Sequence, residues 1–152
     1  MSDNGQFVPP WGCMEGAMKD PGRFVLKLEE AWRTFDPALW TELYHPEATI
    51  RGPQTEGPVG RDELLRNLSR TRAALPDFRF RARRWASRGN TLFIEWTASA
   101  TLAGETVEWD GVDCFELRDG RAIEEIVHFD SLPLRARVDP SLRTGPLLAA
   151  AR

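Results

Sequence analysis

The spacing of the hydrophobic residues changes near Phe78, and this change limits the folds open to the chain. Before it, apolar residues recur every three or four positions, the period of amphipathic helices. After it, they alternate with polar residues at the period of two that half-buried strands show. Helices followed by a run of strands predict an α+β domain, with the helices on one side of a bent antiparallel sheet.

Three helices are predicted in the first half of the chain. The first two begin with Asp-Pro, at Asp20 and Asp36, which is an N-cap followed by proline at the first helical position. The second helix stops at His45, because a residue that precedes proline is pushed out of the helical region. A short strand is expected at 48–51 and a third helix over about 62–75.

Four strands with glycine-containing turns are predicted in the second half, at 78–86, 90–102, 106–117 and 122–130. The 152 residues fit a single domain, which we place at 20–133. Residues 1–19 are rich in glycine and proline but also in apolar side chains, so we expect an irregular arm that packs partly on the body. Residues 134–152 are expected to form a tail, to which we assign no element.

Composition argues against several classes of partner. A net charge of −3 and a pI near 5.5 give no electrostatic reason to expect nucleic acid or an anionic membrane surface. No apolar run approaches the roughly 18 residues needed to span a bilayer, and no secretory signal is recognisable. Two cysteines and two histidines without metal-ligand spacing predict a reduced, cytoplasmic protein with no metal and no other cofactor.

Asp113 is the first candidate functional residue. In the predicted strand 106–117 it shares the core face with Trp109 and Phe115, whereas Cys114 lies on the opposite face. Burying an ionised carboxylate is costly, so such a group is paired, hydrogen-bonded or protonated. A protonated Asp113 would donate a proton or a hydrogen bond to a substrate oxygen. The structural alternative is that it ties down a neighbouring strand or loop.

The last predicted strand leaves two alternatives. Glu125 shares the more apolar face with Val127 and Phe129, which predicts a second interior acid. A bulge that shifts the register by one residue would instead turn His128 and Asp130 inward as an acid–base pair. A histidine near a subunit interface is the structural explanation of His128.

Aromatic residues are dense in the chain, and together they predict an apolar pocket suited to a ring-containing ligand. Each of them individually is also explained as part of the core or the pocket wall. The residues predicted to bind the ligand are Trp32, Trp40, Tyr44, Trp96, Trp109, Phe115 and Phe129.

Four segments resemble a known family and follow in the expected order: LYHPEATI at 43–50, GRDEL at 60–64, FELRDGR at 115–121 and HFD at 128–130. Over about 24–133 the chain resembles SnoaL-like proteins of the nuclear transport factor 2-like superfamily. The resemblance implies a cone of three helices and a curved sheet, often dimeric through the sheet. The family includes polyketide cyclases, ketosteroid isomerases, epoxide hydrolases, dehydratases (lyases) and binding proteins without catalysis, so the resemblance implies one of these functions.

Individual positions match the family's catalytic sets only in part. The segment VDCF at 112–115 is similar to the one that holds the protonated oxyanion-hole aspartate of ketosteroid isomerase, which implies that role for Asp113. The base aspartate of that isomerase falls at Gly52 and its oxyanion tyrosine near Leu28. The last-strand aspartate of the cyclases falls at Val127.

The sequence therefore predicts a small-molecule enzyme that performs cofactor-free acid–base chemistry on an apolar, enolisable or polyketide-like substrate. Cyclisation, isomerisation and dehydration are the reactions that fit. Asp113 would act as acid or oxyanion donor, and Glu125 or His128 as base. The alternative is a non-catalytic module of the same fold, which binds a small molecule or only forms a homodimer.

Overall fold

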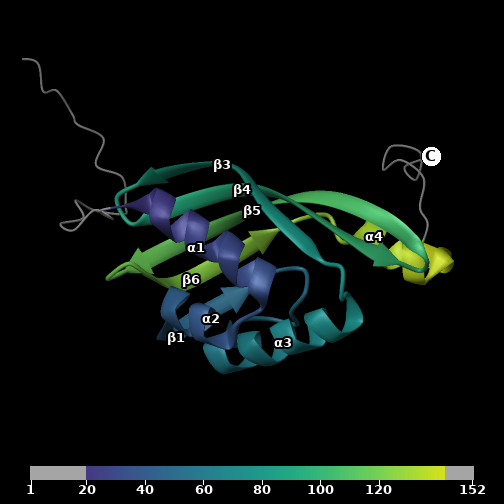
Figure 1. Cartoon of the computed structure of the whole chain (residues 1–152), viewed down its shortest axis with the longest axis horizontal. Coiled ribbons are helices and arrows are strands. Elements are labelled where there is room, and N and C mark those ends of the chain that lie inside the picture. The colour runs from purple at the N-terminus through teal and green to yellow at the C-terminus, as the bar shows by residue number, and fades with distance from the viewer. Residues whose placement is uncertain (1–19, 143–152) are drawn as a thin grey trace, which may run out of the picture.

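The computed structural model describes residues 20–142, and its helices and strands form two layers (Figure 1). The helices are α1 (Pro21–Thr34), α2 (Pro37–Leu43), α3 (Arg61–Ala74) and α4 (Leu132–Val138), with a 3-10 turn at Pro140–Leu142. The strands are β1 (Tyr44–Arg51), β2 (Val59–Gly60), β3 (Arg79–Arg88), β4 (Thr91–Leu102), β5 (Glu105–Arg118) and β6 (Arg121–His128).

The strands form one curved sheet in the order β2-β1-β6-β5-β4-β3. All neighbours pair antiparallel except β1 and β6, which run parallel. Helices α1, α2 and α3 cover one face of this sheet (Figure 1). The predicted α+β fold, with three N-terminal helices on a curved and mainly antiparallel sheet, is therefore confirmed.

Both predicted helix starts are capped as the sequence indicates. Asp20 Oδ1 accepts a hydrogen bond from the backbone N–H of Arg23 at 2.9 Å, and Asp36 Oδ1 accepts one from the N–H of Ala38 at 2.9 Å. These bonds satisfy N–H groups that have no partner within a helix. Phe35, in the left-handed region at φ 53°, ends α1, so that α2 begins two residues later.

The core lies between α1, α2 and the concave face of the sheet. Phe24 of α1 packs edge-on against Phe115 of β5, with ring centroids 5.1 Å apart. The buried side chains around this pair are Val25, Leu28, Ala31, Trp40, Leu43, Tyr44, Ala48, Ile50, Leu68, Leu92, Ile94, Leu117 and Ala122. Some of these core residues, among them Trp40 and Tyr44, also line the candidate site.

Three elements differ from expectation, and one of them is β2, a two-residue strand in a stretch for which no element was predicted. Tyr44, expected in the second helix, instead begins β1, since it has extended φ and ψ of −112° and 135° and pairs with Ala122 of β6. Helix α4 lies in a stretch for which no element was predicted; its Pro133 stands in the first turn, as the prolines of α1 and α2 do. The predicted arm at 1–19 lies outside the described residues, as does most of the predicted tail. No helix among residues 20–142 is long and apolar enough to cross a membrane.

Candidate active site

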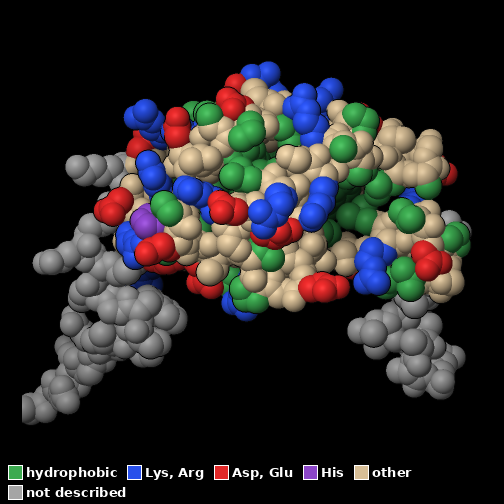
Figure 2. Space-filling model, turned by 90° about the horizontal axis from the view of Figure 1, so that it is seen from below, with side chains coloured by type: hydrophobic (Ala, Val, Ile, Leu, Met, Phe, Trp, Pro, Cys, Tyr) green, Lys and Arg blue, Asp and Glu red, His purple; other side chains and the backbone are tan. Residues whose placement is uncertain are grey.

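A pocket of about 270 Å³ lies between the helices and the concave face of the sheet. Its volume is close to the lower end of ordinary ligand pockets, ~300–1,000 Å³. Side chains from α1, α2, α3 and α4 and from all six strands line it. Hydrophobic side chains are visible in a hollow on the face that carries α3 (Figure 2).

Most of the residues predicted as site residues line this pocket. They are Trp32, Trp40, Tyr44, Trp96, Trp109 and Phe129 among the aromatic residues, and Asp113 and Glu125 among the acids. Phe115 does not line it, because α1 covers that end of β5 and Phe115 is fully buried against Phe24. His128 does not line it either, because its side chain points to the outer face of the sheet.

Asp113 lies on β5, where simple alternation placed it, and is only 4% exposed. Trp96 Nε1 of β4 donates a hydrogen bond to Asp113 Oδ1 at 2.8 Å. Burial raises the pKa of Asp113 well above its ordinary value, and the negative charge of Glu125 raises it further. The Trp96 hydrogen bond opposes this rise but does not cancel it. Burial and the charge of Glu125 therefore favour the protonated form of Asp113.

Gly111 makes the contact between Trp96 and Asp113 possible. Gly111 pairs with Trp96 across the β4–β5 ladder, and the indole lies directly over it. A Cβ atom at residue 111 would lie 2.2 Å from a ring carbon of Trp96, a distance that real side chains do not tolerate. Glycine is thus required here for the indole N–H to lie beside Asp113.

Glu125 lies on β6 and is 6% exposed. The Tyr44 hydroxyl, from β1, donates a hydrogen bond to Glu125 Oε2 at 2.7 Å. Burial raises the pKa of Glu125 to about 7, and the hydrogen bond from Tyr44 opposes this rise. Burial and the neighbouring Glu125 charge also raise the pKa of Tyr44, which keeps the phenol protonated as a donor.

The two acids are neighbours on one face of the sheet. In the β5–β6 ladder Asp113 pairs with Val127, and Phe115 pairs with Glu125, so Asp113 and Glu125 are diagonal neighbours. Glu125, which accepts the Tyr44 hydrogen bond, loses its proton first, near neutral pH. Its charge then keeps the proton on Asp113. The pocket thus holds one acid and one base side by side.

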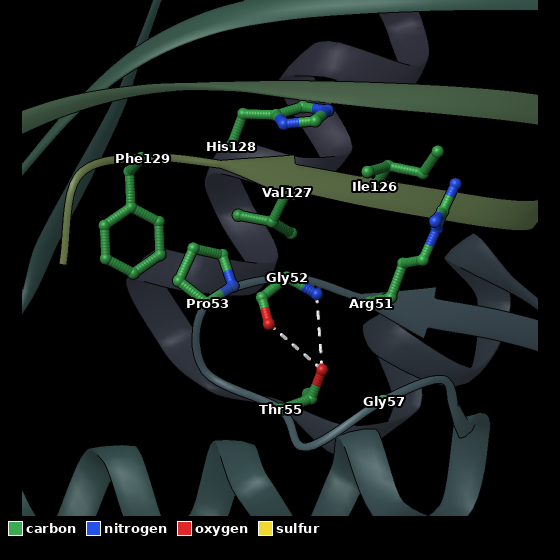
Figure 3. A pocket seen from close by; sticks show the side chains of 9 residues that line it. All are labelled: Arg51, Gly52, Pro53, Thr55, Gly57, Ile126, Val127, His128 and Phe129. Atoms are coloured by element: carbon green, nitrogen blue, oxygen red, sulfur yellow. Dashed lines mark hydrogen bonds between the residues drawn. The ribbon is translucent and has the colours of Figure 1, made fainter.

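The register of β6 decides between the two alternatives for the last strand. A bulge does occur in β6, with Ile123 as the extra residue in its ladder with β5, but it does not turn His128 inward: beyond it Glu125 pairs with the buried Phe115 and faces the interior. His128 pairs with Val112 and points to the outer face of the sheet, where it is exposed. Figure 3 shows His128 on the side of β6 opposite Val127. The structure therefore brings Glu125, and not His128, to Asp113.

His128 instead borders a surface hollow of about 640 Å³ at the ends of β1 and β6 (Figure 3). This hollow is larger than the inner pocket, but neither Asp113 nor Glu125 lines it. Gly52 forms part of its wall and lies close to Val127: a Cβ atom at residue 52 would be 2.7 Å from Val127 Cβ. The position that corresponds to the isomerase base therefore has no room for a side chain, and the carboxyl groups that line the inner pocket are those of Asp113 and Glu125.

Several lining residues were not predicted as site residues. Phe78 and Phe80 of the β3 region join the aromatic wall, and Trp32 stacks on Phe80 with ring centroids 5.7 Å apart. Asn67 and Thr71 add polar groups from α3. Asn67 and Thr71 each lie three positions after a leucine of the predicted third helix, so this helical spacing could have placed them on the face that turns toward the pocket.

Within residues 20–142 the structure contains no group of three or more His, Cys, Asp or Glu side chains that could hold a metal ion. The carboxyl pair of the pocket has instead a tyrosine and a tryptophan as its hydrogen-bond donors. These contacts orient the two acids.

Comparison with known proteins identifies the family. The SnoaL-like domain model matches residues 25–125, and the chain belongs to this family. IdmH of Streptomyces antibioticus, a proposed polyketide cyclase, is 24% identical over 78% of this chain and 97% of its own, with a TM-score of 0.70. TerC, co-crystallised with polyporic acid, is 21% identical over 77% of this chain and 96% of its own, with a TM-score of 0.68.

An NTF2-like protein of unknown function from Burkholderia pseudomallei is 18% identical, over 80% of this chain and 99% of its own, with a TM-score of 0.70. At these identities the solved structures show a shared fold. No curated protein matches the sequence. The chain is therefore a SnoaL-like protein with an NTF2-like fold.

Proposed function

We propose that this protein is an enzyme that performs cofactor-free acid–base chemistry on an apolar, enolisable or polyketide-like small molecule. Cyclisation, isomerisation and dehydration are the reactions of this class. One observation carries the proposal: two buried carboxyl groups with different affinities for the proton line the same aromatic pocket. Titratable groups perturbed in this way are typical of catalytic sites.

In the proposed first step, the Glu125 carboxylate removes a proton from a carbon next to a substrate carbonyl. The electron pair of that C–H bond moves to the carbonyl oxygen, which becomes an enolate. Asp113, protonated, donates a hydrogen bond to this oxygen and stabilises the charge. In cyclisation the α-carbon of the enolate then attacks an electrophilic carbon. In isomerisation the enolate is conjugated and takes up a proton at a different carbon, and in dehydration it expels a β-hydroxyl, which leaves as water. Glu125 or Asp113 supplies the proton that each outcome requires.

The hydrogen-bond donors of the site support the proposed roles of Glu125 as base and Asp113 as acid. Tyr44 donates to Glu125 and favours its ionised form. The aromatic wall excludes water around the pair, and electrostatic interactions are stronger in such a site than in water. The rings of Trp32, Trp96 and Phe129 offer flat apolar surfaces to a ring-containing substrate.

Exchange of carbon-bound hydrogen tests the proposal without knowledge of the natural substrate. The compact bicyclic ketone 2-tetralone is incubated with the protein in D₂O, and loss of its α-proton signals is followed by NMR. We expect exchange faster than in buffer, and a decrease of about 100-fold or more in Asp113→Asn and Glu125→Gln.

Matched controls lie beside both acids on the outer face of the sheet. Asp110→Asn and Glu124→Gln make the same chemical changes at exposed positions and should leave the exchange rate unchanged. If 2-tetralone binds but its exchange is no faster than in buffer, the acid–base proposal is wrong. The alternative of a non-catalytic binding protein then holds.

We further propose that the protein is a cytoplasmic homodimer formed through the outer face of the sheet, as the family resemblance implies. Phe93 of β4 is 48% exposed on this face and Val112 of β5 is 37% exposed. Light scattering after size-exclusion chromatography should give twice the chain mass of 17.2 kDa. Val112→Arg should reduce it to one chain mass, and a monomeric wild-type protein would refute the dimer.

A further inference from the structure

The charges of the pocket wall are all of one sign. Of the residues that line the pocket within the described range, two are carboxylic acids and none is lysine, arginine or histidine. Besides the Tyr44 hydroxyl and the tryptophan N–H groups, the uncharged polar groups of the wall are the amides and hydroxyls of Gln54, Thr55, Asn67 and Thr71. A negatively charged ligand group would therefore find no cationic partner among the described lining residues.

The arginines near the pocket are directed elsewhere. Arg61, at the start of α3, donates from Nη1 to the backbone carbonyl of Tyr44 at 3.4 Å. Arg72, on the same helix, donates from Nη1 to the carbonyl of Thr34 at 2.7 Å and lies over the ring of Phe35. Neither side chain is among those that line the pocket. The site thus differs from one built to hold a carboxylate or a phosphate, which arginine binds with two parallel hydrogen bonds.

The polar groups of the α3 wall suit neutral oxygen atoms. Thr71 Oγ1 donates to the carbonyl of Asn67 at 2.9 Å, which leaves the lone pairs of this hydroxyl to accept a hydrogen bond from a ligand. Asn67 Oδ1 accepts from Arg70 Nη1 at 2.9 Å, which leaves the Asn67 amide N–H groups to donate to a ligand. A ketone or phenol oxygen matches such groups, whereas a full negative charge buried beside them would lack a counter-charge.

We infer that the pocket selects by charge: it binds uncharged ring-containing ketones and phenols, and it rejects carboxylates of the same size and shape. Glu125 and Asp113 produce this selectivity, because the ionised Glu125 repels a second anion in a space largely closed to water. The inference deepens the proposed function, since it takes the same pocket as the substrate site. It requires binding alone and no catalysis.

Two probes of nearly equal shape test the inference by calorimetric titration at pH 8. The neutral probe is 2-acetylnaphthalene, and the anionic probe is 2-naphthoate. We expect the dissociation constant of 2-naphthoate to be about tenfold larger, because at pH 8 the anion either meets the ionised Glu125 or must bind together with a proton on this group, whose pKa is about 7. In the double variant Asp113→Asn/Glu125→Gln the difference should fall below about threefold, through tighter binding of 2-naphthoate.

A pH series gives a second, independent readout. Lowering the pH from 8 to 5.5 protonates Glu125, whose pKa is about 7, so 2-naphthoate should bind more tightly while the ketone binds as before. Equal affinities of the two probes at pH 8 would overturn the inference, as would an unchanged ratio in the double variant. Failure of the neutral ketone to bind at millimolar concentration would also overturn it. The titration measures binding directly. The charge selectivity can therefore be observed even if the protein does not accelerate hydrogen exchange in 2-tetralone, and the two experiments can refute the two proposals independently.

Discussion

The ionisation of Glu125 makes the stability of the folded protein dependent on pH, in a way that Glu125→Gln should abolish. The ordinary pKa of a glutamate is 4.5, and burial raises the pKa of Glu125 to about 7 in the folded state. The folded protein therefore binds more protons than the unfolded chain between these two pH values. The free energy of unfolding must fall as the pH rises through this window.

The size of the effect follows from the two pKa values. A difference of about 2.5 in pKa corresponds to about 3 kcal/mol of unfolding free energy. This contribution is complete below pH 4.5 and is lost once the pH exceeds about 7. The amide of Gln at residue 125 does not titrate, and its carbonyl oxygen still accepts the hydrogen bond of Tyr44.

Urea denaturation followed by circular dichroism, at pH values from 4.5 to 8, measures the difference in unfolding free energy between wild type and Glu125→Gln. Relative to wild type, the variant should gain about 3 kcal/mol across this range. Glu124→Gln, which changes the exposed neighbour, should not gain by more than a few tenths. A wild-type-to-variant difference that stays constant from pH 4.5 to pH 8 would show that Glu125 titrates normally, and the reasoning would be refuted.

Two further predictions concern backbone and packing. Gly111→Ala should lower stability by about 1–3 kcal/mol through its clash with Trp96, and should shift the Trp96 indole N–H resonance; Gly60→Ala, where a Cβ meets open space, is the control. An unchanged indole resonance in Gly111→Ala would contradict the assigned contact. Asp20→Ala should lower the unfolding free energy by about 0.5–2 kcal/mol in thermal denaturation, since it removes the cap of α1; a loss below 0.2 kcal/mol would contradict this.

The sequence indicated the helix starts and the two faces of β5, because these depend on local signals. The Asp-Pro pairs at Asp20 and Asp36 each cap a helix, and alternation placed Asp113 inward and Cys114 outward, as the structure shows. The register of β6 could not be read from local signals: alternation allowed Glu125 or His128 to face inward, and the pairing of Glu125 with Phe115 in the ladder with β5 settles the choice.

The hydrogen-bond partners of the two acids could also be identified only from the folded structure. Tyr44 and Glu125 are 81 residues apart in the chain, and they meet because β1 pairs parallel to β6. No pattern in the sequence indicates that pairing. Phe115 was expected in the pocket because it shares a face with Asp113; the position of α1, which covers Phe115 but not Asp113, depends on how the layers pack.

The central claim is that one pocket carboxyl group is ionised near neutral pH while the other keeps its proton. Carbon-13 NMR of protein labelled at the aspartate and glutamate carboxyl carbons measures this directly, with Asp113→Asn and Glu125→Gln used to assign the two signals. The account predicts that the Glu125 signal titrates near pH 7, whereas the Asp113 signal remains that of a protonated acid at pH 7. Titration of both signals below pH 5 would contradict it.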